Sequence, residues 1–282
     1  MFEFASTSAL PAAACLRNAN ENPTPKGAAR LVCPSIDNVS DFAMQPRPRT
    51  KHSDVLIVVP AYNESATIAR VAAQLEQLPY DYLVINDGST DNTAEILRDI
   101  RAPHINLCKN LGIGGAVQTG YKFAYANGYD IAVQFDGDGQ HDAGCIERLI
   151  APIREGRADF VVGSRFVSSD NQFLSSRSRR TGIFILSKLI QLVTGTRILD
   201  VTSGFRAASR RIIKQFVDYY PADYPEPETL AGILAGGMRV QEVGVIMHER
   251  AGGTSSIGAI SSVYYMIKVG LSILLVHPYE RR

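Results

Sequence analysis

The sequence predicts an α/β fold of Rossmann-like type, with a mostly parallel central sheet and flanking helices. Two observations support this prediction. Short, wholly apolar runs rich in Val and Ile recur along the chain, and segments with helical periodicity stand between them. Such a run is typical of a parallel strand that is buried on both faces. Alternation of strands and helices at this spacing is typical of right-handed βαβ units.

The first half of the chain supplies the clearest elements. Residues 55–59 (VLIVV) are expected to form a strand, and residues 64–78 a helix with Ile68, Val71 and Leu75 on one face. Further strands are expected at residues 82–85, 104–108, 131–135 and 159–162, and further helices at residues 91–100, 116–126 and 143–154.

Beyond Gly163 the alternation changes. Residues 164–180 are polar and basic, and residues 181–193 are expected to form an apolar helix. Residues 202–209 and 240–247 are expected to form later strands. Because no internal repeat is visible, the second half is expected to elaborate the first half rather than to form a separate domain.

The two ends of the chain differ from its middle. Residues 1–52 are rich in Ala, Asn, Ser and Pro without sustained periodicity, which predicts a disordered extension. Met44 is an alternative start, and no basic segment precedes the short apolar patch as it would in a signal peptide. Residues 257–282 are apolar at helical spacing and predict a C-terminal amphipathic helix.

Composition restricts the function classes. With 45% hydrophobic and 20% charged residues, the chain is expected to be a soluble globular protein. A net charge of +1 argues against a nucleic-acid partner. The four cysteines are scattered without CxxC spacing, so neither a disulfide framework nor a zinc site is expected. Reduced thiols predict a cytoplasmic protein.

Three acidic motifs follow predicted strands: PAYNE at residues 60–64, NDGSTD at 86–91 and DGDGQH at 136–141. In open α/β sheets, ligands bind at the carboxyl ends of the strands. Crowded carboxylates are costly unless a cation joins them. The three motifs therefore predict a ligand site with a bound cation at one edge of the sheet.

The DGDGQH motif predicts the cation site. Asp136 and Asp138 offer hard oxygen ligands suited to Mg²⁺ or Mn²⁺, and Gln140 can add an amide oxygen. An Asp/Gly-rich turn without a ligand is the alternative, since a lone DxD is weak. An EF-hand is disfavoured, because its loop position five would be Gln140 and its flanks are strand and helix.

Other motifs suggest contacts with a nucleotide. Asp87 stands at a strand end where its carboxylate can accept from a nucleobase, and Tyr62 can pack on the base face. Thr90 or Asp91 is expected to cap the next helix. Residues 110–115 (NLGIGG) either cradle phosphate or provide close backbone packing.

Arginines supply the opposite charge. Arg165 follows the fifth predicted strand, Arg177, Arg179 and Arg180 form a cluster, and Arg206 stands in the motif SGFR. A basic run is usually a solvated face. Beside three acidic motifs, however, guanidinium groups are what an enzyme that handles phosphate requires.

Together these motifs make the sequence recognisable. Residues 55–256 resemble family 2 glycosyltransferases of the GT-A fold, in particular the dolichyl- or polyprenyl-phosphate sugar transferase branch. The resemblance rests on motifs that occur in the expected order: VPAYNE from Val59, NDGSTD from Asn86, NLGIGGAVQTGY from Asn110, DGDGQH from Asp136, GSRF from Gly163, SRR from Ser178, TSGFR from Thr202 and ERAGGTSS from Glu249. It implies a GT-A domain at residues 53–256.

The resemblance also implies roles. It assigns the nucleotide base and ribose to Pro60, Tyr62, Glu64 and Asp87. It assigns metal and diphosphate to Asp136, Asp138 and Gln140. It assigns donor or acceptor phosphates to Arg165, Arg179 or Arg180, and Arg206, with Asp138, Arg165 and Arg206 as the catalytic set. The chain departs from the family pattern at Asn86, where an acid is usual, and at Ile113, where a basic residue is common.

The implied reaction inverts the anomeric carbon of a nucleotide-sugar donor. A lipid-phosphate acceptor is already anionic and needs no general base. A saccharide hydroxyl would need one, and Glu226 and Glu228 are candidates that equally suit the start of a helix. A nucleotide-sugar-binding module without turnover and a nucleotidyltransferase are the remaining alternatives. His141 and His248 are expected to be structural or surface residues.

The C-terminal helix bears on the acceptor. It either docks on its own domain or lies on a bilayer, with Lys268, Arg281 and Arg282 near anionic headgroups. A small membrane-embedded partner is a further expectation for this surface. The expected location is therefore cytoplasmic, with peripheral contact on the inner face of the membrane.

Overall fold

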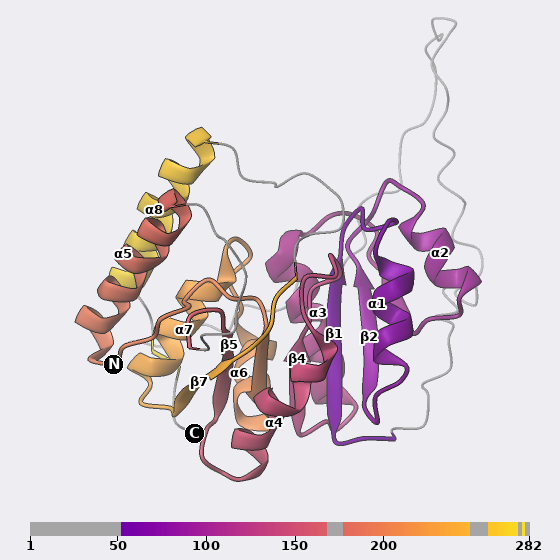
Figure 1. Ribbon diagram of the computed structural model, residues 1–282, viewed down its shortest axis with the longest axis horizontal. Coiled ribbons are helices and arrows are strands. Elements are labelled where there is room, and N and C mark those ends of the chain that lie inside the picture. The colour runs from indigo at the N-terminus through magenta and orange to yellow at the C-terminus, as the bar shows by residue number, and fades with distance from the viewer. Residues whose placement is uncertain (1–51, 168–176, 249–258, 276–277, 280–282) are drawn as a thin grey trace, which may run out of the picture. The chain divides into compact units, whose positions relative to one another are not determined.

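A seven-stranded mixed sheet forms the centre of the computed structural model (Figure 1). The structure describes residues 52–167, 177–248, 259–275 and 278–279, without the side chains of residues 177–179 and 259–265. The described residues all belong to one unit, Pro46–Arg282. The predicted extension therefore lies outside the described residues except for His52.

One half of the sheet is parallel. In spatial order it contains β3 (His104–Asn106), β2 (Asp81–Asn86), β1 (Val55–Ala61) and β4 (Ile131–Gln134). All four strands point the same way. Every residue of β1 and β4 is buried, as the wholly apolar run predicted for β1. The predicted mostly parallel sheet is confirmed.

The other half departs from the simple βαβ pattern. The short strand β6 (Arg206–Ser209) lies between β4 and β5 (Phe160–Ser164) and is antiparallel to both. The last strand, β7 (Val240–Gly244), pairs with β5 in parallel. This arrangement sets Arg206 opposite Gln134 in the middle of the sheet.

Helices cover both faces of the sheet. Alternate side chains of β1 enter two separate apolar clusters, as the period of a strand requires. One cluster includes residues of α1 (Ile68–Leu75), α2 (Thr93–Asp99) and α4 (Ile146–Arg154). The other includes residues of α3 (Gly112–Ala126), α5 (Arg177–Thr194), α6 (Arg210–Asp218), α7 (Pro225–Ala235) and α8 (Ala259–Leu274).

Several predicted boundaries shift for local reasons. The first helix begins at Ile68 rather than at residue 64, because the carbonyl of Glu64 accepts from the amides of Thr67 and Ile68 in a preceding turn. Residues 202–205 form a loop, and only Arg206–Ser209 pair as a strand. The seventh helix begins at Pro225, a residue well suited to a first helical position.

The C-terminal segment forms α8 within the predicted range. Val269 and Ile273 are buried, whereas Ile267, Leu271 and Leu274 are exposed. Across the described ranges, we find no helix with the length and hydropathy that a membrane crossing demands.

Candidate functional site

The carboxyl ends of β1, β2 and β4 bring the three acidic motifs together. The amide of Asp87 donates to the carbonyl of Ala61 at 2.9 Å, and the amide of Gly137 donates to the carbonyl of Pro60 at 3.2 Å. The backbones that follow three neighbouring strands are therefore bonded directly to one another. The parallel register, rather than any contact between side chains, explains why these motifs share an edge.

The first two motifs form an interlocked pair of turns. Asn63, at φ 55°, donates its amide to Ser89 Oγ at 2.9 Å and accepts from the amide of Thr90 at 2.8 Å. Asn adopts this left-handed backbone conformation more readily than most residues, and it is common in turns. Tyr62 next to it remains 46% exposed. The turn thus fixes the backbone and leaves an aromatic ring facing outward.

Asp87 is tied to the glycine-rich loop. It is buried, and its Oδ1 accepts from the amide of Leu111 at 2.7 Å. Gly114 approaches a neighbouring segment closely, since a Cβ there would lie 2.0 Å from the carbonyl oxygen of Pro221. The sequence left phosphate binding and close backbone packing open for residues 110–115, and close backbone packing accounts for Gly114.

The DGDGQH motif forms a loop directly after β4. Asp136 Oδ1 accepts from Gln134 Nε2 at 3.4 Å, and Asp138 Oδ1 accepts from the amide of Gln140 at 3.0 Å. The amide of His248 donates to the carbonyl of Gln140 at 2.8 Å. The segment after β7 therefore closes one side of this loop.

His141 contacts both the backbone and the carboxylate of Asp136. Its ring stacks on Phe205 at 4.6 Å between centroids and meets Phe135 edge-on. Nδ1 accepts from the amide of Asp136 at 3.1 Å, so we assign the proton to Nε2, which lies 3.6 Å from Asp136 Oδ2. Burial lowers the pKa of His141 to about 4. The imidazole is therefore neutral at pH 7, and it positions a carboxylate.

The loop fits a divalent cation. A Cβ on Gly204 would lie 2.7 Å from Asp136 Oδ2, so only glycine leaves room for that carboxylate. Within the described ranges, no three His, Cys, Asp or Glu side chains form a closed metal cluster. Two carboxylates and an amide oxygen are donors that suit an open Mg²⁺ or Mn²⁺ site, in which water and a bound phosphate supply the remaining ligands.

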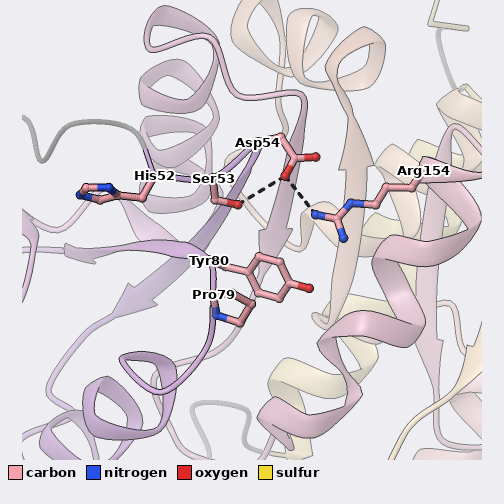
Figure 2. Close-up of a pocket in the computed structure, with 6 residues that line it drawn as sticks. All are labelled: His52, Ser53, Asp54, Pro79, Tyr80 and Arg154. Atoms are coloured by element: carbon pink, nitrogen blue, oxygen red, sulfur yellow. Dashed lines mark hydrogen bonds and ion pairs between the residues drawn. The ribbon is translucent and has the colours of Figure 1, made fainter.

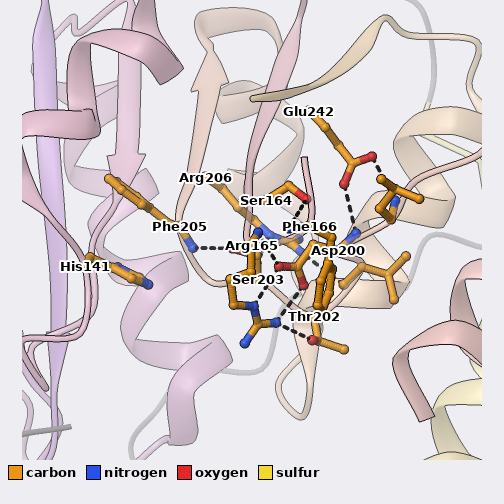
Figure 3. Close-up of polar contacts among 12 residues, drawn as sticks. His141, Ser164, Arg165, Phe166, Asp200, Thr202, Ser203, Phe205, Arg206 and Glu242 are labelled. Atoms are coloured by element: carbon orange, nitrogen blue, oxygen red, sulfur yellow. Dashed lines mark hydrogen bonds and ion pairs between the residues drawn. The ribbon is translucent and has the colours of Figure 1, made fainter. Parts of the chain in front are cut away.

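Arg165 lies in a buried ion pair (Figure 3). Its Nε donates to Asp200 Oδ2 at 2.7 Å, and its Nη2 donates to Asp200 Oδ1 at 2.6 Å. Nη2 also donates to Thr202 Oγ1 at 3.0 Å. Glu242 in turn accepts from the amides of Leu199 and Asp200. The guanidinium thus holds the loop after α5 against β5.

Arg206 requires a correction. The sequence suggested that it meets a phosphate, but the side chain is only 1% exposed and makes four hydrogen bonds within the protein. The acceptors are the carbonyls of Val201, Ser203 and Glu226, and Thr229 Oγ1. The structure therefore makes Arg206 a positioning residue that joins the 200–205 loop to the start of α7.

The other predicted arginines lie on α5. Arg180 is exposed, whereas the side chain of Arg179 is outside the described residues. Neither is brought into contact with the DGDGQH loop by any described hydrogen bond. The two acidic candidates on α7 also differ, because Glu228 accepts from Tyr219 Oη at 2.8 Å and burial raises the pKa of Glu226.

The fold and motifs have clear relatives. A family model described as glycosyl transferase family 2 matches residues 56–217. The chain belongs to glycosyl transferase family 2. The UDP-N-acetylglucosamine–dolichyl-phosphate N-acetylglucosaminyltransferase of Methanococcus voltae is 34% identical over 199 residues, which cover 64% of this chain and 79% of the relative. The polyprenol monophosphomannose synthase of Mycolicibacterium smegmatis is 25% identical over 230 residues, which cover 76% and 84%.

Solved structures agree with this family 2 fold. Glucosyl-3-phosphoglycerate synthase from Mycobacterium tuberculosis, in complex with Mn²⁺, UDP-glucose and phosphoglyceric acid, superposes with a TM-score of 0.60. The alignment covers 79% of this chain and 80% of that chain at 22% identity. The likeness shows the predicted GT-A fold.

Two residues of this glycosyltransferase that contact the DGDGQH loop were not predicted from the sequence. Thr67 Oγ1 donates to the carbonyl of Gly137 at 2.8 Å, and the guanidinium of Arg70 packs on Gly139. Their spacing of three residues at the start of a helix was the available signal, since i and i+3 share a face.

A cavity at the opposite edge is separate from this site (Figure 2). It is lined by His52, Ser53, Asp54, Pro79, Tyr80 and Arg154, with Asp54 paired to Arg154 at 2.9 Å. These residues precede β1 and β2 or end α4. The cavity therefore lies at the amino ends of the strands, away from the three motifs.

Proposed function

We propose that this family 2 glycosyltransferase moves a sugar from a nucleoside-diphosphate sugar to a polyprenyl phosphate. One observation supports this choice above all. Relatives that align over much of the chain are named as a dolichyl-phosphate N-acetylglucosaminyltransferase, an undecaprenyl-phosphate mannosyltransferase and a polyprenol monophosphomannose synthase, at 34%, 32% and 25% identity. The site geometry supports the donor half of the reaction independently.

The nucleoside binds at the first two motifs in this proposal. Tyr62 offers an exposed ring to the base, with Pro60 before it near the end of β1 and Glu64 two residues after it. Asp87 uses Oδ1 to hold Leu111, so we assign the contact with the base to its Oδ2. The GT-A domain of the proposal spans residues 53–256.

The diphosphate binds at the DGDGQH loop. Asp136, Asp138 and Gln140 would hold Mg²⁺ or Mn²⁺, which supplies positive charge to the leaving diphosphate. Gln134 and His141 orient the Asp136 carboxylate before any substrate arrives. Asp138 is held by the amide of Gln140. A site whose dipoles are fixed in advance loses little energy to reorganisation during the reaction.

The chemistry requires no general base with this acceptor. An acceptor phosphate oxygen forms a bond to the anomeric carbon as the bond to the donor diphosphate breaks, and the bonding electrons leave with the diphosphate. No proton moves, because the acceptor is already ionised. Arg179 and Arg180, on the first turns of α5, are the proposed contacts for the acceptor phosphate.

Transfer to a saccharide hydroxyl is the second candidate, and Glu226 favours it. Burial raises the pKa of this carboxyl, and Asp136 raises it further. A carboxylate with a raised pKa is a better base near neutral pH. Glu226 would then accept the hydroxyl proton as the acceptor oxygen attacks.

Peripheral membrane contact is part of the proposal. Helices α5 and α8 pack together, with Gly182 beside Met266 and Gly270 beside Leu189. Apolar side chains next to this seam are exposed: Ile185 and Leu192 on α5, and Ile267, Leu271 and Leu274 on α8. A rim of this kind suits an interfacial position on the inner face of a membrane, or a small membrane partner.

The basic residues of this tail are less informative. Lys268 is paired to Asp223 at 2.6 Å, so its charge is partly compensated within the protein. Arg281 and Arg282 lie outside the described residues. The apolar rim, rather than basic charge, is the main support for membrane contact.

The test is transfer of labelled sugar from UDP-, GDP- and dTDP-sugars to polyprenyl phosphate in detergent. Label in the organic phase that disappears with EDTA, returns with Mn²⁺ and is lost in Asp138→Ala would support the proposal. Label only on an added saccharide, lost in Glu226→Gln, would favour the second candidate. Binding of donor without transfer to any acceptor, under conditions where a related enzyme works, would leave a binding module instead.

A further inference from the structure

The start of α1 lies directly on the DGDGQ loop, residues 136–140. Thr67 bonds the carbonyl of Gly137 from a fully enclosed position, being only 2% exposed. One turn later, Arg70 covers Gly139. A Cβ placed on Gly139 would lie 2.5 Å from Arg70 Nη2 and 3.5 Å from its Cζ. The guanidinium therefore lies against the loop backbone, in space that a side chain at Gly139 would occupy.

Two other arginines among the described residues, Arg165 and Arg206, make their hydrogen bonds within the protein. Arg165 is bidentate to Asp200, and the donors of Arg206 hold backbone carbonyls. Arg70 differs from both, because it is exposed and has no hydrogen bond or ion pair with another residue that the structure describes. The donor diphosphate carries two negative charges, which its divalent cation balances, and cleavage of the bond to the sugar adds a third negative charge to the leaving diphosphate. A planar guanidinium suits phosphate oxygens.

We propose that Arg70 binds the diphosphate of the nucleotide-sugar donor, from the side of the loop that α1 contacts. The inference rests on the proposed function, because it assumes that a nucleoside diphosphate occupies the site. The position of α1 reinforces it, since Thr67 brings the amino-terminal end of this helix to the loop, and that end carries partial positive charge. Gly139, at φ +74°, is then required twice, for the turn and for the close approach of Arg70.

The experiment compares three single variants of the full chain. Arg70→Gln removes the charge at similar length, and Arg70→Lys keeps the charge but loses the fork. Arg98→Gln is the matched control, because Arg98 is an exposed arginine on the neighbouring helix α2 and is not part of the site. Circular dichroism melts establish that each variant folds, which is expected because Arg70 is exposed.

Calorimetry with Mn²⁺ then measures the affinity for UDP, GDP and dTDP and for the matching nucleosides. For whichever diphosphate the wild type binds, we expect Arg70→Gln to weaken binding roughly tenfold or more, the loss typical of a hydrogen bond to a charged group. Arg70→Lys should weaken it less, and Arg98→Gln not at all. Nucleoside affinity should not change, and the dependence of diphosphate affinity on salt should become shallower in Arg70→Gln.

The two proposals fail in different ways. If the wild type binds none of the nucleoside diphosphates, the proposed function is wrong at its donor site. If the wild type binds one and Arg70→Gln binds it equally well, the function stands and the role of Arg70 is refuted. Equal weakening of nucleoside and diphosphate would also refute it, because Arg70 would then only support the loop.

Discussion

Substitution of Asp200 by alanine should destabilise the protein strongly. Asp200 is fully buried and accepts three hydrogen bonds from Arg165, two from the guanidinium and one from the amide. Its loss leaves a guanidinium that is 5% exposed without its counter-charge. Breaking one partner of such a buried pair costs about 3–5 kcal/mol. At about 2–4 °C per kcal/mol for a protein of this size, Tm should fall by roughly 6–20 °C.

Urea unfolding followed by far-ultraviolet circular dichroism measures this loss, because the chain has no Trp for fluorescence. Glu155→Ala is the matched control, since it breaks the exposed pair with Arg157 and should cost less than about 1 kcal/mol. The double variant Arg165→Met/Asp200→Leu should recover much of the stability, because neither charge is then buried.

The result also tests the role of Arg165. If Asp200→Ala unfolds within about 1 kcal/mol of the wild type, the pair is not structural and the reasoning from burial is refuted. If Arg165→Met is equally stable but raises KM for the donor, the contact with phosphate expected from the sequence is correct instead.

Three further predictions concern other parts of the molecule. In the metal-free protein, burial lowers the pKa of His141 to about 4, so as pH falls below 6.5 the imidazole is protonated in the unfolded chain before it is protonated in the folded protein. The free energy of unfolding should therefore drop by about 3 kcal/mol between pH 6.5 and 4. Urea titrations of His141→Gln at several pH values should lack this contribution to the pH dependence. Gly204→Ala should weaken Mn²⁺ binding about 10–100-fold in calorimetry by displacing Asp136, whereas Gly270→Ala, with its nearest neighbour at 3.8 Å, should not. Leu192→Glu, at a site 80% exposed, should reduce co-sedimentation with anionic vesicles and leave Tm within about 2 °C; unchanged sedimentation would argue against α5 as part of the membrane face.

The sequence was most informative where burial is continuous. A wholly apolar run such as residues 55–59 identifies a strand enclosed on both faces, and the polar motif after it then falls at the ligand edge. That is why the parallel half of the sheet and the DGDGQH loop were predictable. The antiparallel position of β6 was not, because a four-residue strand carries no signal of direction or neighbour.

The environment of the arginine side chains could not be predicted from the sequence. A guanidinium has the same sequence signature whether it faces a phosphate or lies inside the protein. The depth of Arg165 depends on Asp200, 35 residues later, and that of Arg206 on α7. Arg70 was not predicted, because it lies in an ordinary amphipathic helix and belongs to none of the motifs. Only the fold places its guanidinium against Gly139.

The insertion of β6 between β4 and β5 has a consequence for synthesis on the ribosome. Until residue 209 has left the exit tunnel, β4 has a partner on only one side, and its other edge presents unpaired backbone groups. The loop with Asp136 follows that open edge directly, so the nascent chain cannot complete the site early. Release of a chain that ends before residue 209 would leave this edge of β4 unpaired and prone to aggregation, whereas a chain that includes β6 covers it.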